Sequence, residues 1–238
     1  MGSASAKTLA RELNARRVYP DRTYRTRNSD FIINWGNGAI PNWYNERVKV
    51  WNNPEAVNRA GNKLLTFKAL EGNCPIPNFT TNKDDTTEWE KVVVRHELRG
   101  SAGSGIEVVR QGEELPDAPM YVEFIKKNAE YRVHVFAGEV IDITQKRRIR
   151  DFDEESRVPY IRNHANGWVF SRNNIDYRED IQEVALDSVR ALGLDFGGVD
   201  VIIGRDDNPY ILEVNTAVGM EGSTVEKYVN KIKELRGF

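Results

Sequence analysis

A stretch near the carboxyl end of the chain limits the fold more than any other. Residues 198–203 (GVDVII) and 210–215 (YILEVN) are short apolar runs separated by GRDDNP. β-Branched residues fill the runs, and Gly, Asp, Asn and Pro fill the connection, so the pattern predicts two strands joined by a tight turn. Polar side chains interrupt the apolar strands at Asp200, Glu213 and Asn215.

These three polar residues form a candidate metal site. Side chains two positions apart on a strand point to the same face, so Glu213 and Asn215 share a face, and hairpin pairing can bring Asp200 beside them. Two carboxylates and an amide oxygen are hard ligands suited to Mg²⁺, which completes its shell with phosphate and water. The alternative to a metal site is a set of solvent-facing polar residues on an edge hairpin without a ligand.

The order of the other elements predicts an α+β fold without the strict βαβ alternation of a dinucleotide-binding domain. Helices are expected over 6–16 with Ser5 as N-cap, 53–72 between Asn53 and Gly72, 178–192, and 223–237, where Ser223 and Glu226 have the spacing of a capping box. The segment 151–174 reads as polar and irregular. Strands are expected over 31–34, 91–95, 106–109, 120–125, 131–136 and 139–144.

Composition excludes several classes of protein. The 238 residues contain 34 Lys+Arg and 36 Asp+Glu, a net charge of −2, so a globally basic nucleic-acid binder is excluded. The single cysteine, Cys74, excludes an intrachain disulfide. The apolar runs are too short for a membrane span, and the first residues lack an apolar signal-peptide core, which predicts a cytoplasmic protein without a membrane partner.

Two further features point to phosphate binding. The loop RGSAGSG, between the strands at 91–95 and 106–109, is rich in glycine, and such a loop can direct several N–H groups at one anion. Because it joins strand to strand, it matches neither the P-loop nor the Rossmann fingerprint, and a mobile hairpin loop is the alternative. Basic side chains that could converge on a triphosphate, or simply be solvated, are Lys63, Arg95, Arg132, Lys146, Arg147, Arg148 and Arg150.

Taken together, these residues resemble the ATP-grasp superfamily, and most closely its RimK-type carboxylate–amine ligases, over about residues 54–236. The most specific part is GGVDVIIGRDDNPYILEVNTAVGMEGST, which resembles the family's metal-binding segment. The resemblance implies two α+β subdomains that clamp ATP. It divides the chain into a shortened N-terminal α/β region (1–53) and an ATP-grasp domain (54–238), with a Gly-rich lid subdomain over about 75–120 and a metal-binding subdomain over about 121–238.

The resemblance also implies roles for individual residues. Lys63 matches the family's first nucleotide-binding lysine, and Arg95 falls where the family usually has a second lysine; the planar fork of Arg95 replaces a point charge. Arg132, Lys146, Arg162 and Asn163 would serve the transfer step, with Gly167 completing a loose "R-x-N…G" element. Ser101, Gly103 and Ser104, within the Gly100–Gly105 loop, would cover the phosphates. Adenine would be recognised by Glu123, Phe124 and Ile125 and would lie on an apolar floor formed by Leu212, and Glu130 would bind the ribose. The metal ligands would be Asp200, Glu213 and Asn215.

The activity implied by the resemblance is ATP-dependent ligation of a carboxylate to an amine through an acylphosphate, with release of ADP and phosphate. Its cofactors would be ATP and two Mg²⁺ ions, with Mn²⁺ as an alternative metal. The acceptor would be an amino acid, peptide or protein. An ATP-grasp phosphotransferase and a non-catalytic nucleotide- or nucleic-acid-binding adaptor are the competing hypotheses.

The N-terminal region departs from the family, since only about 53 residues precede Pro54. This shortness leaves an open acceptor site or a homodimer as interpretations. The basic stretch Arg16–Arg27, with Tyr19 and Tyr24 interleaved, is either a site for an anionic polymer or a solvated face.

Overall fold

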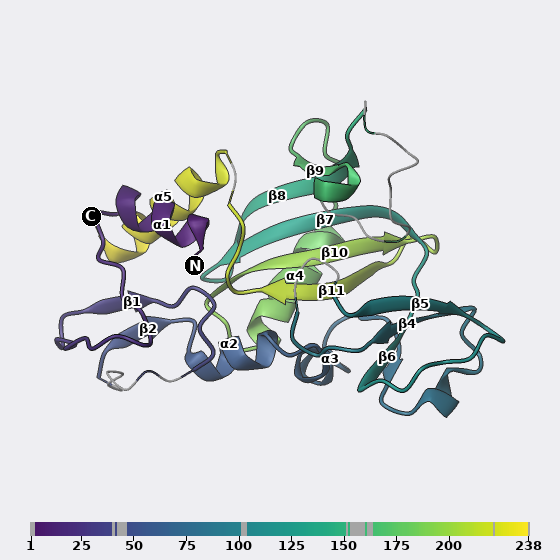
Figure 1. Cartoon of the computed structure of the whole chain (residues 1–238). Coiled ribbons are helices and arrows are strands. Elements are labelled where there is room, and N and C mark those ends of the chain that lie inside the picture. Colours follow the sequence, from purple (N-terminus) through teal and green to yellow (C-terminus); the bar gives the residue numbers. More distant parts are fainter. Residues whose placement is uncertain are drawn as a thin grey trace.

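The computed structural model describes residues 3–39, 41, 47–100, 104–150, 152, 160, 164–220 and 222–237. The described residues form three sheets and five α-helices (Figure 1). None of the helices within these ranges has the length and apolar character needed to cross a bilayer.

The largest sheet has five antiparallel strands in the order β11-β10-β7-β8-β9. Ala137 and Gly138 both adopt positive φ (50° and 79°) in the turn between β7 and β8, which suits a two-residue hairpin. The predicted strands 198–203 and 210–215 pair as expected, whereas β7 and β8 are longer than predicted, so that Lys146 and Arg148 lie on β8 and not after it. The strands are β7 (Lys127–Phe136), β8 (Glu139–Arg148), β9 (Trp168–Ser171), β10 (Phe196–Gly204) and β11 (Pro209–Asn215).

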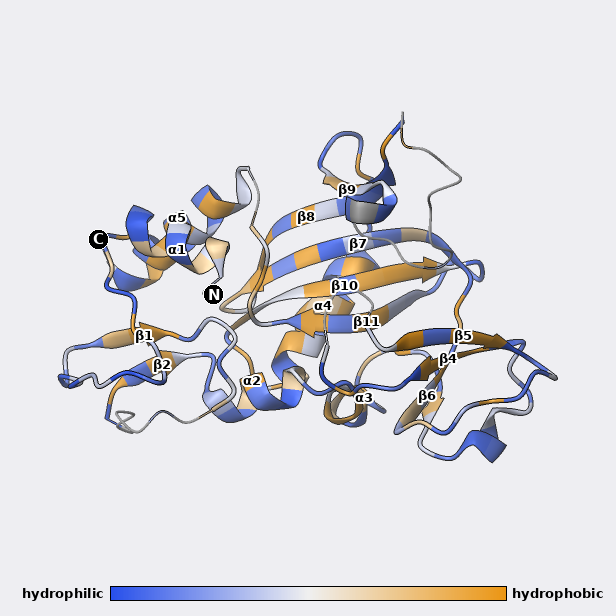
Figure 2. Cartoon of the chain, viewed as in Figure 1, coloured by the Kyte–Doolittle hydropathy of each residue, from blue (hydrophilic) through white to orange (hydrophobic). Residues whose placement is uncertain are grey.

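One face of this sheet is apolar and the other is polar. Helix α4 (Glu179–Ala191) packs on the apolar face, where Val133, Val199 and Val201 are completely buried. Figure 2 shows the alternation as blue and orange bands along β7, whereas β10 is mainly orange. Because neighbouring strand residues point to opposite faces, Arg132 and Asp200 lie on the face away from α4. This polar face is where the predicted site residues meet.

A second sheet has four antiparallel strands in the order β3-β6-β4-β5 and lies beside the first (Figure 1). Its core is formed by Val92, Val94, Val109 and Tyr121. The short 3₁₀ helix η1 (Lys83–Thr86) follows its first strand. The strands are β3 (Phe79–Thr80), β4 (Lys91–Arg95), β5 (Ile106–Arg110) and β6 (Met120–Glu123).

The single helix predicted over 53–72 is wrong. The chain forms α2 (Pro54–Ala60) and α3 (Lys63–Leu70), separated at Gly61 and Asn62. Asn62 has extended φ/ψ and its side chain accepts a hydrogen bond from Leu65 N (3.1 Å), so it caps a new helix. The Thr66 hydroxyl donates to the carbonyl oxygens of Arg59 and Ala60 (3.2 and 3.1 Å), which satisfies the end of α2.

The N-terminal region packs with the last helix at one end of the five-stranded sheet (Figure 1). Helix α1 (Ala4–Glu12) contacts α5 (Thr224–Arg236), and β1 (Phe31–Ile33) pairs in parallel with β2 (Lys49–Trp51). The strand β2 was not predicted, because three residues carry too little periodicity. Phe136, Phe196, Trp35 and Tyr228 form an aromatic cluster beneath this region, with the Phe136 and Phe196 rings stacked at 5.1 Å.

Two predicted helix caps are corrected by the structure. The N-cap of α1 is Ser3, whose hydroxyl accepts from Ala6 N (3.4 Å), and Ser5 lies inside the helix. Ser223 does not form the capping box, because its φ/ψ (−67°, −10°) are already helical and an N-cap needs an extended conformation. The Gly237 terminus of α5 is confirmed in the left-handed conformation.

The segment 164–171 is more regular than predicted. His164–Asn166 forms the 3₁₀ helix η2, and Trp168–Ser171 forms β9, which pairs with β8. The four residues of β9 are half-buried on both sides, so they lack the alternation that marks a strand in a sequence.

Asn52 joins the N-terminal region to the sheet. It is fully buried and has a positive φ of 62°. Its Oδ1 accepts hydrogen bonds from Asp195 N and Phe196 N (2.8 and 3.1 Å), and its Nδ2 donates to Phe196 O (2.9 Å). The backbone N–H of Asn52 donates to the Asp195 carboxylate (2.6 Å). One side chain therefore satisfies the backbone at the start of β10.

Asp142 anchors α5 to the polar face of the sheet. Its side chain is almost completely buried and accepts hydrogen bonds from Thr224 Oγ1, Lys227 Nζ and Arg172 Nη2 (2.6, 2.6 and 2.8 Å). Burial alone would raise the pKa of Asp142, but these donors outweigh it and hold the pKa at about 2.

We expect Asp142→Asn to lower the free energy of unfolding near neutral pH by about 2–3 kcal/mol, because two basic side chains lose their buried partner. Since the pKa of Asp142 is lower in the folded chain than in the unfolded chain, its stabilisation is complete above about pH 4 and is lost as the pH falls toward 2. The variant should therefore lose less stability on acidification than the parent. Urea denaturation at about pH 7 and about pH 3 measures both effects. The control is Asp187→Asn, whose exposed pair with Arg190 (2.9 Å) is worth less than about 1 kcal/mol; equal losses in the two variants would contradict the assignment.

Candidate functional site

The predicted site residues meet on the polar face of the five-stranded sheet. Asp200 and Glu213 are direct cross-strand partners in the β10–β11 hairpin, and Arg132 is the partner of Asp200 on β7. Arg132 donates to both carboxylate oxygens of Asp200 (2.7 and 2.8 Å), and Asn215 Nδ2 lies 3.5 Å from Asp200 Oδ2. Asp200, Glu213 and Asn215 thus lie together, as the hairpin predicted.

The ion pair between Arg132 and Asp200 is largely buried. The two side chains are 19% and 14% exposed. Burial alone would raise the pKa of Asp200, but Arg132 outweighs it and keeps that pKa below its usual range. Burial alone would lower the pKa of Arg132, but Asp200 reverses that shift. Both groups are therefore charged at neutral pH, and they form a preorganised charge pair at the centre of the face.

A β-bulge sets the direction of Glu213. The pairing register shifts between Asp200 and Val201, so that Glu213 pairs with Asp200 and Ile211 pairs with Val201. Leu212 is the extra residue, and it is half-buried. The bulge lets Ile211 pack in the core on the α4 side while Glu213 points to the polar face. Sequence alternation alone would have placed both on one face.

Two basic side chains approach Glu213 from outside the large sheet. Lys63 at the start of α3 is buried, and its Nζ lies 2.8 Å from Glu213 Oε2. Arg95, the last residue of β4, has a buried Nε with no hydrogen-bond partner in the described part of the chain. Burial lowers the pKa of Arg95, and the nearby Glu213 opposes that shift. A buried guanidinium N–H without an acceptor is matched to an anionic ligand such as a phosphate oxygen.

Glu130 lies in the same face but is enclosed by two lysines. Its side chain is 6% exposed, and the carboxylate pairs with Lys127 Nζ at 2.7 Å and with Lys146 Nζ. Burial alone would raise the pKa of Glu130, but the two ammonium groups lower it. The carboxylate predicted to bind ribose is thus engaged within the chain.

The aromatic ring of Phe170 covers two of the cations. The Arg132 guanidinium lies 4.5 Å from the centre of this ring, and the Lys146 Nζ lies 5.1 Å from it. Phe170 is on β9, opposite Lys146. This residue was missed in the sequence because β9 was not predicted; the half-buried WVFS stretch between polar segments was the available signal. His134, on the same face as Arg132, has its pKa lowered by burial to about 4, so it adds no charge near neutral pH.

The predicted adenine-binding segment lies at the end of β6. The N–H groups of Glu123 and Phe124 donate to the carbonyl oxygens of Asn78 and Lys91 (2.8 and 3.0 Å), and the Glu123 carboxylate accepts from Asn78 Nδ2 (2.8 Å). Ile125 directly follows them in the link between the two sheets.

The glycine-rich loop is only partly described. Ser104 is described, and a Cβ at Gly100 would lie 2.6 Å from its Oγ, so a larger residue at position 100 would have to displace the Ser104 side chain. His96 N donates to Gly105 O (2.9 Å), which closes the base of the loop. Ser101, Gly103, Arg162 and Asn163 lie outside the described residues, so their predicted roles remain predictions.

The chemistry of the donors suits Mg²⁺ and a polyphosphate. No cluster of three or more His, Cys, Asp or Glu side chains able to hold a metal is present among the described residues; the predicted set combines two carboxylates with an amide. These are hard oxygen donors on neighbouring strands, a set that leaves positions for phosphate and water. Around them, five basic side chains against three acidic ones leave a net charge of about +2; they are Lys63, Arg95, Lys127, Arg132, Lys146, Glu130, Asp200 and Glu213.

Curated relatives align with most of this chain. It is 30% identical over 214 residues to tetrahydromethanopterin:alpha-L-glutamate ligase of Methanocaldococcus jannaschii, covering 81% of this chain and 70% of that one. It is 29% identical over 191 residues to ribosomal protein bS6–L-glutamate ligase of Escherichia fergusonii, covering 72% of this chain and 60% of that one. Against the probable alpha-L-glutamate ligase of Parasynechococcus marenigrum, the match spans 40% of the relative's length. The matches thus span between 40% and 70% of the length of these relatives.

Solved structures show the same fold at low identity. D-Alanine–D-alanine ligase from Bacillus anthracis superposes with a TM-score of 0.57 at 19% identity, over 79% of this chain and 73% of that one. The ATP-grasp ligase PsnB, solved with a phosphomimetic precursor variant, Mg and ADP, superposes with a TM-score of 0.55 at 16% identity, over 74% and 56%. The α+β fold predicted from the sequence is therefore confirmed as the ATP-grasp fold. In addition, residues 60–219 match the ATP-grasp domain family model, and the chain belongs to the ATP-grasp family.

Proposed function

We propose that the chain joins a carboxylate to an amine at the expense of ATP, with release of ADP and phosphate. The observation that carries the proposal is the polar face: Asp200 and Glu213 lie directly opposite each other, Asn215 lies beside them, and Arg132 and Lys63 pair with the two carboxylates. Curated relatives named as glutamate ligases support the same reaction class.

The reaction consists of two displacements. A carboxylate oxygen of the substrate attacks the γ-phosphorus of ATP, and the bond to the bridging oxygen of ADP breaks, giving an acylphosphate. The amine nitrogen then attacks the acyl carbon, the bond to the phosphate oxygen breaks, and the amine loses a proton. Neither displacement requires a protein nucleophile. The chain's task is to align two anions and to compensate the negative charge that they bring together.

Basic residues of the site supply that compensation. Lys63 and Arg132 pair with the carboxylates of Glu213 and Asp200. The same two cations would become available to phosphate oxygens if the carboxylates held a metal ion, and Arg95 presents an Nε–H that has no partner among the described residues. Mg²⁺, held by Asp200, Glu213 and Asn215, would supply charge neutralisation of the phosphates.

We also propose the division of the chain. Residues 1–53 form the N-terminal region and 54–238 the ATP-grasp domain. Strands β3–β6 belong to one sheet and β7–β11 to the other, so the change of sheet falls between Glu123 and Lys127, close to the boundary at about residue 121.

The test is a substrate screen with the full chain and Mg-ATP. Amino acids and peptides are supplied in pairs, and mass spectrometry looks for a product equal to the two substrates minus water. L-Glutamate heads the panel because the relatives are named glutamate ligases. ADP release should depend on both a carboxylate and an amine. AMP release, a stable phosphorylated product without an amine, or nucleotide binding without turnover would each contradict the proposal.

A further inference from the structure

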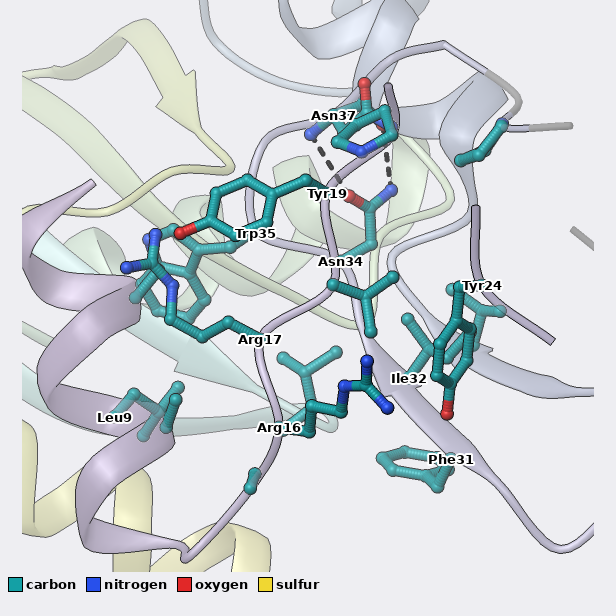
Figure 3. A pocket seen from close by; sticks show the side chains of 18 of the residues that line it. Leu9, Arg16, Arg17, Tyr19, Tyr24, Phe31, Ile32, Asn34, Trp35 and Asn37 are labelled. Carbon is teal, nitrogen blue, oxygen red and sulfur yellow. Dashed lines mark hydrogen bonds between the residues drawn. The ribbon is translucent and has the colours of Figure 1, made fainter. Parts of the chain in front are cut away.

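A second concave site lies in the N-terminal region, away from the polar face. The cavity has a volume of about 480 Å³ and opens between α1, the segment that follows it, and the β1–β2 pair (Figure 3). This volume is within the range of small-molecule sites in proteins. None of the polar-face residues described above lines it. The cavity is therefore a separate site from the polar face.

The walls of the cavity are mainly apolar. The apolar lining includes Leu9 of α1, Leu13 directly after α1, Phe31 and Ile33 of β1, Val18 and Val50. Leu9 is only 4% exposed, so the wall on the α1 side is part of the core. Trp35 also lines the cavity, and its ring stacks on that of Phe196 with 5.2 Å between the ring centres. Such a surface favours a ligand with an apolar body.

Two arginines give the cavity a positive charge. Figure 3 shows Arg16 lying between α1 and β1 with its guanidinium directed toward Tyr24, and its Cζ lies 5.5 Å from the centre of that ring. The Arg17 guanidinium lies 5.1 Å from the centre of the Tyr19 ring. Neither arginine forms an ion pair with any carboxylate in the described part of the chain. Guanidinium groups stacked on aromatic rings are held in place for an anion.

The cavity offers few competing acceptors. Asp30 is the one acidic side chain among the described residues that line it, and its Oδ2 already accepts from Tyr24 Oη and Arg27 N (2.9 and 2.8 Å). In addition, the buried Nε1–H of Trp35 has no hydrogen-bond partner in the described ranges. Donors without acceptors and an apolar lining define an amphipathic anion as the matching ligand.

We propose that this cavity binds a carboxylate with an apolar body, with Arg16 contacting the carboxylate. Figure 3 shows the Arg17 guanidinium directed away from that of Arg16, toward Tyr19, so Arg17 adds positive charge on the other side of the cavity. The carboxylate pairs with the guanidinium fork, and the apolar part lies against Leu9, Phe31 and Ile33. An extended anionic polymer is a different class of ligand, and it needs a continuous basic groove that follows its backbone. The lining beside Arg16 and Arg17 is instead mainly apolar.

The experiment is calorimetric titration of the full chain without ATP or Mg²⁺. The probes are acetyl-leucyl-phenylalanine and octanoate, each compared with its neutral amide. We expect at least one of the two carboxylates to bind. The affinity of its neutral amide should be lower by a factor of about ten or more. The tighter of the two probes identifies a peptide end or an alkyl chain as the source of the carboxylate.

Variants assign the binding to the cavity. Arg16→Gln combined with Arg17→Gln should weaken the carboxylate about tenfold or more. The matched control, Arg25→Gln with Arg27→Gln, removes the same charge from the same segment outside the lining and should leave affinity unchanged. Glu213→Ala should also bind the probe normally, which separates this site from the catalytic one.

Four results would overturn the inference. The first is that neither carboxylate binds, and the second is that acid and amide bind equally. The third is that the two double variants have equal effects. The fourth is that a single-stranded oligonucleotide binds as strongly as the carboxylate probe and is weakened by Arg16→Gln/Arg17→Gln. Because no result depends on turnover, failure here leaves the ligase proposal standing. Conversely, failure of ligation leaves the binding result intact.

Discussion

Glu213→Ala is expected to reduce turnover by about a thousandfold or more while the fold is retained. Glu213 contacts both the acidic and the basic part of the site: it is the cross-strand partner of Asp200, and its carboxylate lies 2.8 Å from Lys63 Nζ. Its removal takes away one of two carboxylates for a divalent cation and leaves Lys63 without its acid. Because the Glu213 side chain is 30% exposed, its loss creates no buried cavity of consequence.

The measurement is ADP release with the substrate pair found in the screen, alongside circular dichroism and thermal unfolding of the variant. Glu234→Ala is the control, since Glu234 is an exposed residue of α5 whose carboxylate pairs with Lys231, which is not one of the site residues. It should keep the turnover of the parent. If Glu213→Ala turned over at the parent's rate, the assignment of Asp200, Glu213 and Asn215 to metal would be wrong.

Arg132→Met is expected to destabilise the chain by about 3–5 kcal/mol and to abolish turnover. Arg132 donates twice to Asp200, which is 14% exposed, and stacks on Phe170. Without the guanidinium, the Asp200 carboxylate remains buried without its counter-ion. Its pKa should then rise, since burial raises it once Arg132 no longer opposes that effect.

A double variant distinguishes stability from catalysis. Arg132→Met with Asp200→Asn removes both charges and should recover most of the lost stability, because no unpaired charge is left in the sheet. It should not recover turnover, since a metal ligand and a phosphate-binding cation are both missing. Urea denaturation of the two single variants and the double variant gives the coupling energy. Additive losses would show that the two side chains do not stabilise each other.

The hairpin that carries the metal set was predictable because its evidence is local. Period-two alternation and a Gly/Asp/Asn/Pro turn fix β10 and β11, and pairing then brings Asp200 to Glu213. The bulge at Leu212 was not predictable, since it depends on Ile211 packing against α4. The break between α2 and α3 was missed for a related reason: Gly61 and Asn62 are tolerated in a helix pattern, and only the tertiary contacts show that Asn62 begins a new one.

Long-range polar contacts were the least predictable part. The sequence indicated that Lys63, Arg95, Arg132 and Lys146 converge, but not that three of them are already paired with acids within the chain. Asn52 gave no signal either, because a single asparagine in a connection has many uses. Such pairings depend on which strands are neighbours, and periodicity carries no information about that.

The link made by Asn52 has a consequence for folding during synthesis. Its partners, Asp195 and Phe196, follow it by 143 and 144 residues. At about 5–20 residues per second, a ribosome needs on the order of 7–30 s to produce them after Asn52. Throughout that interval the nascent amino-terminal segment has apolar side chains without a surface to cover them, and it completes its docking only after β10 has emerged.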